Sequence, residues 1–198
     1  MTRVLPYDSN EQLTPHINAR EIRCKCGKGH NTLIDVDMLK KIENIINDIS
    51  GFEGVEPSSV KIYISSGYRC IQHDINVGGN GSGAHTTGNA LDFEIIVNHK
   101  VYDNKIIAGL LQDYGFNGIG RIDDNYIHGD TAPISMHGGK KWLGDETAPN
   151  GTNNSIINEP MTYWNFYGIS KPCKKSETIT VEMAVNGKKY KGVLSNEN

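Results

Sequence analysis

The apolar residues of positions 35–49 recur at helical spacing. Residues three and four positions apart lie on one face of an α-helix, and the apolar ones here are Met38, Leu39, Ile42, Ile45, Ile46 and Ile49. Asp35 stands in the position of an N-cap, and Gly51 and Gly54 end the pattern. Residues 103–114 show the same spacing, so the sequence predicts two amphipathic helices.

Strands are indicated where apolar and polar residues alternate. The alternation runs over residues 60–64 and again over 90–96, and a short helix is predicted between them at 71–77. Two further short strands, 117–122 and 125–130, flank a pair of aspartates and predict a hairpin. The order of the main elements is helix, strand, strand, helix, strand, strand. It predicts an α+β domain with a small, mostly antiparallel sheet flanked by helices.

The rest of the chain differs in character. Residues 1–23 are polar and irregular, and we place them with the first domain, 1–135. Residues 136–175 mix glycine, asparagine and proline with aromatic residues, so we predict an irregular segment packed on that domain. Residues 176–198 hold two alternating runs joined by Asn-Gly at 186–187, which is the strongest short-range signal for a β-hairpin.

Composition narrows the classes of partner. The chain has 20 Lys and Arg against 23 Asp and Glu, a net charge of −3, and no basic patch stands out, which argues against nucleic acid as a partner. No apolar run is long enough to span a bilayer. The N-terminus lacks the apolar core of a secretory signal. The location therefore stays open between the cytoplasm, another export route and a trimmed secreted form, and we expect a monomer.

The four cysteines give no zinc motif by spacing. Only Cys24 and Cys26 are close in the sequence, and one C-x-C pair is less than the two C-x-x-C pairs of a zinc ribbon. We interpret Cys24, Cys26, Cys70 and Cys173 as reduced, partly buried thiols. A disulfide from one of the close pair to Cys70 is the alternative in an oxidising compartment.

Two histidines and a carboxylate form a candidate metal site. Asp92 lies in a predicted strand among apolar residues, where a charge is costly unless it is paired. His85 lies in the glycine-rich stretch before it, and His128 lies in a later strand. Two histidines and one carboxylate are a common ligand set for catalytic zinc, which keeps the fourth position for water. Each residue alone is also compatible with a structural role.

Two longer motifs carry a resemblance. The stretch SGYRCIQHDINVGGNGSGAHTTGNALDFEI, residues 66–95, resembles the M15 family of zinc peptidases, the D-alanyl-D-alanine carboxypeptidase group. The later GIGRIDDNYIHGD, residues 118–130, is similar to the G-I-G and F-V-H-x-D motifs of one branch, and REIRCKCGKG resembles its E-F-x-C-x-C-G. The resemblance covers roughly residues 15–132. The matching residues are Ser66, Gly67, Tyr68, Arg69, Val77, Gly78, Gly79, His85, Gly88, Ala90, Asp92, Gly118, Gly120, His128 and Asp130.

The resemblance implies a zinc peptidase that uses zinc-activated water on peptidoglycan peptides. The reaction would be D-alanine carboxypeptidase trimming or endopeptidase cleavage within the stem or cross-link. It implies Zn²⁺ held by His85, Asp92 and His128, and Arg69 as the group that grips the substrate or the developing oxyanion. It also implies the compact fold shared with the hedgehog signalling domain. The missing signal segment and the C-terminal hairpin favour a phage-type lysin or a mobile-element protein as the setting.

The general base is the point at which the sequence departs from the family. Many members carry Asp or Glu three residues before the last histidine, where this chain has Asn125. We predict Asp130 as the base, because it shares a strand face with His128, and Asp124 is the alternative. The other interpretation of Asp130 is that it only orients His128. Gly83 also stands where the family usually has a serine.

Two other functions fit the same residues. A non-catalytic binding module of this fold would keep the zinc for structure, and the missing acid at position 125 is its best support. A cell-wall zinc amidase would cut the bond between sugar and peptide.

Overall fold

The computed structural model describes residues 1–147, 157, 160–175, 178–185 and 188–195, the last two ranges by their backbone. Its centre is a six-stranded sheet in the order β3-β4-β7-β6-β8, with β5 paired to β4. The strands are β3 (Lys61–Ser66), β4 (Ala90–Val97), β5 (Lys100–Val101), β6 (Gly118–Arg121), β7 (Ile127–Asp130) and β8 (Trp142–Asp145). All pairings are antiparallel except β6 with β8. The α+β class and the β6–β7 hairpin are confirmed.

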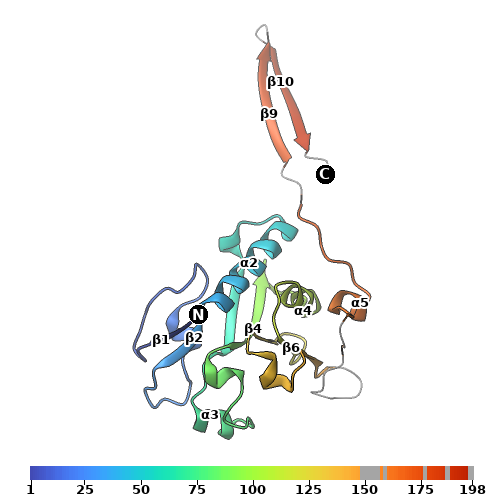
Figure 1. The fold of residues 1–198 in the computed structure, drawn as a ribbon. Coiled ribbons are helices and arrows are strands. Elements are labelled where there is room, and N and C mark those ends of the chain that lie inside the picture. Colours follow the sequence, from blue (N-terminus) through green and yellow to red (C-terminus); the bar gives the residue numbers. More distant parts are fainter. Residues whose placement is uncertain (148–156, 158–159, 176–177, 186–187, 196–198) are drawn as a thin grey trace.

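The two predicted amphipathic helices cover one face of this sheet. They are α2 (Val36–Glu53) and α4 (Asn104–Asp113), which Figure 1 shows beside β4 and β6. Their apolar residues share one core with Leu91, Phe93 and Ile95 of β4, each 0% exposed. Because side chains alternate along a strand, Asp92 lies on the opposite face of β4 from this core.

Helix α2 is longer than predicted. The side chain of Asp35 accepts a hydrogen bond from the Asp37 amide, as an N-cap does. Of the two glycines predicted to end the helix, Gly54 is confirmed as its C-cap, whereas Gly51 lies within the helix, which continues to Glu53. Gly54 has a φ of 65°, the left-handed conformation that glycine adopts at low cost. The other helical segments are α1 (Ala19–Ile22), α3 (Ile71–Asn76), α5 (Tyr163–Tyr167), η1 (Pro57–Ser59), η2 (Ala84–Thr87) and η3 (Ile134–His137).

The N-terminal segment is more regular than predicted. Strand β1 (Thr2–Leu5) pairs antiparallel with β2 (Thr32–Asp35) to form a separate two-stranded sheet. Leu5, Ile17 and Ile22 are buried in the core. A few apolar residues at long intervals anchor this segment, and they leave no period in the sequence for a pattern search to detect.

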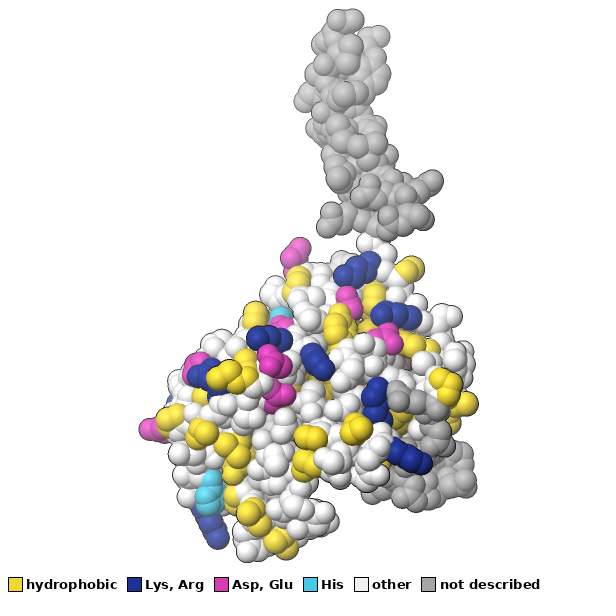
Figure 2. Space-filling view, in the orientation of Figure 1, with side chains coloured by type: hydrophobic (Ala, Val, Ile, Leu, Met, Phe, Trp, Pro, Cys, Tyr) yellow, Lys and Arg dark blue, Asp and Glu magenta, His cyan; other side chains and the backbone are white. Residues whose placement is uncertain are grey.

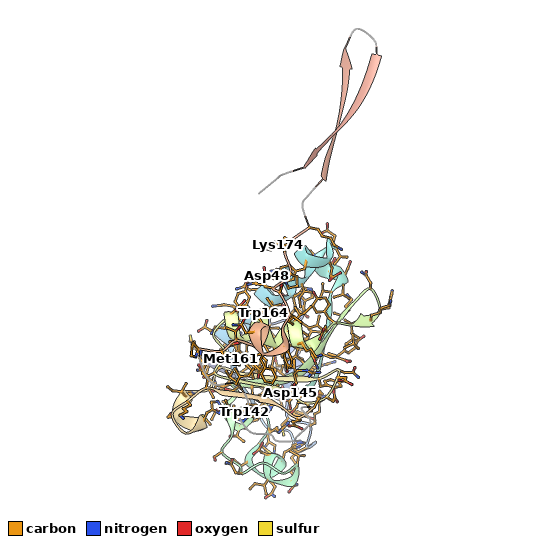
Figure 3. The ribbon with its side chains drawn as sticks, turned by 90° about the vertical axis from the view of Figure 1, so that its right-hand side faces the viewer. Asp48, Trp142, Asp145, Met161, Trp164 and Lys174 are labelled. Atoms are coloured by element: carbon orange, nitrogen blue, oxygen red, sulfur yellow. The ribbon has the colours of Figure 1, made fainter. Side chains whose placement is uncertain are left out.

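The segment after the β6–β7 hairpin also contains regular elements. Strand β8 extends the sheet beside β6, and α5 places Tyr163, 0% exposed, against the body. The hydroxyl of Tyr163 lies 3.0 Å from the carbonyl oxygens of Ile119 and Gly144. In Figure 3, Trp142, Met161, Trp164 and Lys174 follow this segment across one side of the body, and Lys174 forms an ion pair of 3.1 Å with Asp48.

The chain ends in the predicted β-hairpin. Strands β9 (Thr178–Val185) and β10 (Lys188–Ser195) pair antiparallel as a sheet of their own. In Figures 1 and 3 this hairpin extends away from the body that carries the larger sheet. The predicted Asn-Gly turn at 186–187 lies outside the described residues. Within the described part of the chain, no helix has both the length and the apolar character needed to cross a membrane.

Candidate active site

Strand register brings two of the predicted ligands together. Asp92 on β4 pairs directly with His128 on β7, so their side chains leave the sheet on the same face. The Nδ1 atom of His128 lies 2.8 Å from Oδ1 of Asp92. Asp92 is 7% exposed although it lies on the face away from the main core. On that face Asp92 contacts His85, His128 and Arg69. These partners explain why a carboxylate is tolerated in an otherwise apolar strand.

His85 joins this pair from the turn before β4. It lies in η2, and Gly88 ends that turn with a φ of 76°. The Nδ1 atom of His85 lies 2.7 Å from the carbonyl oxygen of Gly67, so it carries the proton and donates it. The other ring nitrogen, Nε2, faces the pair and lies 3.2 Å from Oδ1 of Asp92.

One atom from each of His85, Asp92 and His128 lies within 4.8 Å of the other two, a spacing that suits a single metal ion. Burial opposes ionisation of Asp92, but hydrogen bonds from the two histidines outweigh it and hold the pKa of Asp92 well below its usual range. Burial also disfavours the charged form of His128, yet hydrogen bonds to Asp130 and Asp92 raise its pKa to about 10. The donor set of two imidazoles and one carboxylate fits Zn²⁺.

Asp130 lies behind His128. Its side chain is 0% exposed, and its Oδ2 lies 3.1 Å from Nε2 of His128, the nitrogen that faces away from Asp92. Its Oδ1 accepts a hydrogen bond from the Ala132 amide at 2.9 Å and lies 3.0 Å from Nε2 of His137. A carboxylate on the far nitrogen of a ligating histidine fixes the orientation of the ring. This geometry matches the orienting alternative for Asp130, and the role as base stays a prediction.

The two glycines of the G-I-G motif make room for this arrangement. Gly118 lies opposite Asp130, and Gly120 lies opposite His128. A Cβ atom on Gly120 would come within 2.4 Å of Cη2 of Trp142. The absence of a side chain at Gly120 lets the Trp142 ring lie edge-on to His128, with 5.7 Å between the ring centroids.

Arg69 follows the end of β3 and contacts the candidate ligand Asp92. Its Nη2 donates to Oδ2 of Asp92 at 2.7 Å and its Nε donates to the Ser66 hydroxyl at 2.8 Å. Its Nη1 lies 3.6 Å from Oδ1 of the buried Asp74. The guanidinium is therefore fixed against the oxygen of Asp92 that does not contact His128. Its predicted contact with substrate stays a prediction.

A pocket of about 420 Å³ opens over these groups. The three candidate ligands and Arg69 line it together with Val77, Ile122, Trp142 and Glu146. Among the described residues that line the pocket, Asp92 and Glu146 carry the carboxylates. Partial burial and the nearby charge of Asp92 raise the pKa of Glu146. The other predicted base, Asp124, is 94% exposed in its side chain and lies 3.5 Å from Arg121.

Sequence reasoning missed three contributors to the site. Trp142 is the first residue of β8, and Glu146 directly follows that strand. His137 contacts Asp130 from η3. All three belong to the segment that the sequence indicated only as irregular. The one local signal was the aromatic content of that segment, which pointed to packing and not to a position beside the metal ligands.

The fold and this geometry define a metallohydrolase-like centre, in which two imidazoles and a carboxylate converge at the base of an open pocket. A family model described as Peptidase M15 matches residues 15–130, and the chain belongs to that family of peptidases. The match includes all three candidate ligands, Arg69 and Asp130. Searches of curated proteins and of solved structures found no match.

Proposed function

We propose that the protein is a zinc-dependent peptidase that hydrolyses stem or cross-link peptides of peptidoglycan. The observation that carries the proposal is the convergence of His85, Asp92 and His128 on one open pocket. Membership of the M15 family supports peptidase chemistry. The resemblance to the D-alanyl-D-alanine carboxypeptidase group supports the substrate class.

His85 through Nε2, Asp92 through Oδ1 and His128 through Nδ1 would hold the metal. Zn²⁺ bound there supplies Lewis-acid chemistry, which polarises a peptide carbonyl and lowers the pKa of water. The two histidines keep their orientation because each has its other ring nitrogen occupied. Gly67 accepts from His85, and Asp130 holds His128.

Glu146 is our choice for the general base. It lines the pocket beside the candidate ligands, whereas Asp130 is fully buried on the far side of His128. A raised pKa suits a group that must accept a proton near neutral pH and return it to the leaving amine. The non-catalytic alternative loses support, because the missing acid at position 125 has a counterpart in the pocket.

Arg69 provides positive charge at the pocket wall. The Arg69 side chain is 21% exposed, and its guanidinium is held by Asp92 and Ser66. A fixed guanidinium suits a substrate carboxylate or a developing oxyanion. The pocket is large enough for a short peptide end and has apolar walls at Val77 and Ile122.

We propose that the protein works as a monomer and does not bind nucleic acid. Figure 2 shows Lys and Arg interspersed with Asp and Glu on the face in view.

The test is product analysis of a peptidoglycan digest by mass spectrometry. We expect cut peptide bonds with the zinc-loaded protein, none after chelation, and recovery when zinc is added back. His128→Ala should abolish activity and lose one equivalent of zinc relative to the wild type. His99→Asn is the matched control, because His99 is exposed with a φ of 63°, which asparagine tolerates.

Three outcomes separate the functions. Release of the intact peptide from sugar would identify an amidase and contradict the peptidase proposal. Binding of peptidoglycan without any product would support the non-catalytic module. A pentapeptide ending in D-Ala-D-Ala, compared with one ending in L-Ala-L-Ala, distinguishes a carboxypeptidase for D-alanine from an endopeptidase.

A further inference from the structure

Three cysteines and two histidines meet near the start of α3, outside the pocket of the candidate active site. Cys24 and Cys26 lie on the loop after α1, and His30 lies just before β2. Cys70 is the N-cap residue of α3, and His73 lies in its first turn. Two groups within this cluster have ligand atoms within 4.8 Å of one another: Cys26 with His30 and Cys70, and Cys24 with Cys26 and His73.

The sulfur atoms have the separation of metal ligands. Sγ of Cys70 lies 3.9 Å from Sγ of Cys26. In a tetrahedral site with Zn–S bonds of about 2.3 Å, two thiolates lie about 3.8 Å apart. None of the three cysteines forms a disulfide in this structure.

His30 has a nitrogen without a partner. Its Nε2 is a buried atom with no hydrogen-bond partner in the described part of the chain. A buried polar atom of this kind is costly, and most are paired. Because Cys26 and Cys70 lie within ligand distance of His30, a cation bound among them would satisfy this nitrogen.

Backbone amides surround the sulfur atoms. The Cys70 amide donates to Sγ of Cys24 at 3.3 Å, and the His73 amide donates to Sγ of Cys70 at 3.4 Å. Amide donors favour the thiolate over the thiol, and the thiolate is the form that binds a metal.

We propose that Cys24, Cys26, Cys70 and His30 form a second, structural zinc site. Cys26, His30 and Cys70 already have ligand atoms within 4.8 Å of one another, and Cys24, which shares the other group with Cys26, would supply the third thiolate. Three thiolates and one imidazole would then form a closed tetrahedral set, which is the arrangement of structural zinc. The ligands come from two distant parts of the chain. The spacing of these four ligands along the sequence therefore resembles none of the zinc motifs that lie within a short stretch.

The site would attach the N-terminal loop to the active site. Cys70 directly follows Arg69, whose guanidinium contacts Asp92. A metal that fixes Cys70 against Cys24 and Cys26 fixes the backbone that presents Arg69. The inference does not depend on peptidase activity, because the ligands are separate from His85, Asp92 and His128.

Cobalt substitution tests the site in the full-length protein. Co²⁺ bound by thiolates gives a charge-transfer absorption in the near-ultraviolet, and the candidate active site contains no thiolate. We expect this absorption in the wild type and in the double variant His85→Ala, His128→Ala, with one tightly bound metal remaining in the double variant. Cys173→Ser is the matched control, because Cys173 is exposed and belongs to neither group of candidate ligands.

Variants of the ligands test the assignment. Cys26→Ser and His30→Ala should each lower zinc content by one equivalent and weaken the cobalt absorption, whereas His73→Ala should change neither. His30→Cys should keep the metal and raise the charge-transfer intensity by about a third, as a fourth thiolate replaces imidazole. This variant keeps the test valid if His30→Ala fails to fold.

Two results would overturn the proposal. One is a wild type without thiolate-to-cobalt absorption that contains a Cys26–Cys70 or Cys24–Cys70 disulfide by peptide mapping. The other is loss of the absorption in His73→Ala but not in His30→Ala, which would reject this ligand set.

Discussion

Gly118 lies directly opposite Asp130 in the β6–β7 pair, and a Cβ atom on Gly118 would come within 1.7 Å of Oδ2 of Asp130. That oxygen is the one that lies 3.1 Å from Nε2 of His128. The glycine therefore leaves the space in which a buried carboxylate reaches a candidate metal ligand. Any side chain at position 118 must move Asp130, which is fully buried and cannot shift into solvent.

Gly118→Ala should weaken zinc binding at the candidate active site. Displacing the carboxylate that orients a metal-bound histidine typically costs about 10- to 100-fold in metal affinity. The measurement is competition with a chromophoric chelator. Gly83→Ala is the control, because Gly83 is two residues from His85, has a φ of −77°, and has no atom within 4 Å of its Cβ position. Equal affinities in the two variants would contradict the orienting role of Asp130.

Glu146→Gln should reduce turnover with little change in zinc content. Loss of a general base costs roughly 10²- to 10⁴-fold in rate. Asp130→Asn should show the opposite pattern, in which zinc affinity falls and turnover recovers at saturating zinc. If Asp130→Asn or Asp124→Asn stays inactive when fully loaded while Glu146→Gln remains active, the base is one of the two aspartates that the sequence indicated.

The three candidate ligands could be proposed from the sequence because their identity and order are distinctive. His85, Asp92 and His128 combine chemically suited side chains with glycine-rich motifs, whereas the face of β4 that carries Asp92 became clear only in the folded sheet. Strand register then completes the site, since Asp92 and His128 are direct partners.

The remaining parts of the site depend on long-range contacts. Glu146 reaches the pocket because β8 pairs in parallel with β6, and nothing in the local sequence of β8 specifies its partner strand. The place of His30 in the cysteine cluster escaped prediction for the same reason, because His30 approaches Cys26 and Cys70 only in the folded chain. The β1–β2 sheet left no apolar period to detect.

Zinc binding at the active site should release a proton from His128. Because its pKa is about 10, the His128 ring of the metal-free protein is an imidazolium at pH 7, with a proton on both Nδ1 and Nε2. A metal on Nδ1 displaces that proton, so the apparent zinc affinity should rise with pH up to about pH 10. Asp92 adds no such dependence near neutral pH, because its pKa is held well below its usual range and it is already ionised.

Titration calorimetry in buffers of different ionisation enthalpy measures this release. The wild type should release about one proton more than His128→Ala, in which the proposed cysteine site would serve as an internal reference. Identical proton release in the two proteins would show that His128 is neutral before the metal binds.

The C-terminal hairpin is predicted to be separable from the chemistry. Strands β9 and β10 pair only with each other as a sheet, and none of the candidate ligands lies in them. A lone two-stranded hairpin is at best marginal in water, so it is expected to gain stability by docking on the body or on a partner.

Deleting residues 176–198 should leave zinc content intact and turnover of a small soluble peptide nearly unchanged, while binding to whole cell wall falls. The measurements are the thermal midpoint and a cell-wall pull-down on the truncated chain. A large drop in the midpoint, with unchanged pull-down per folded molecule, would instead assign the hairpin to packing.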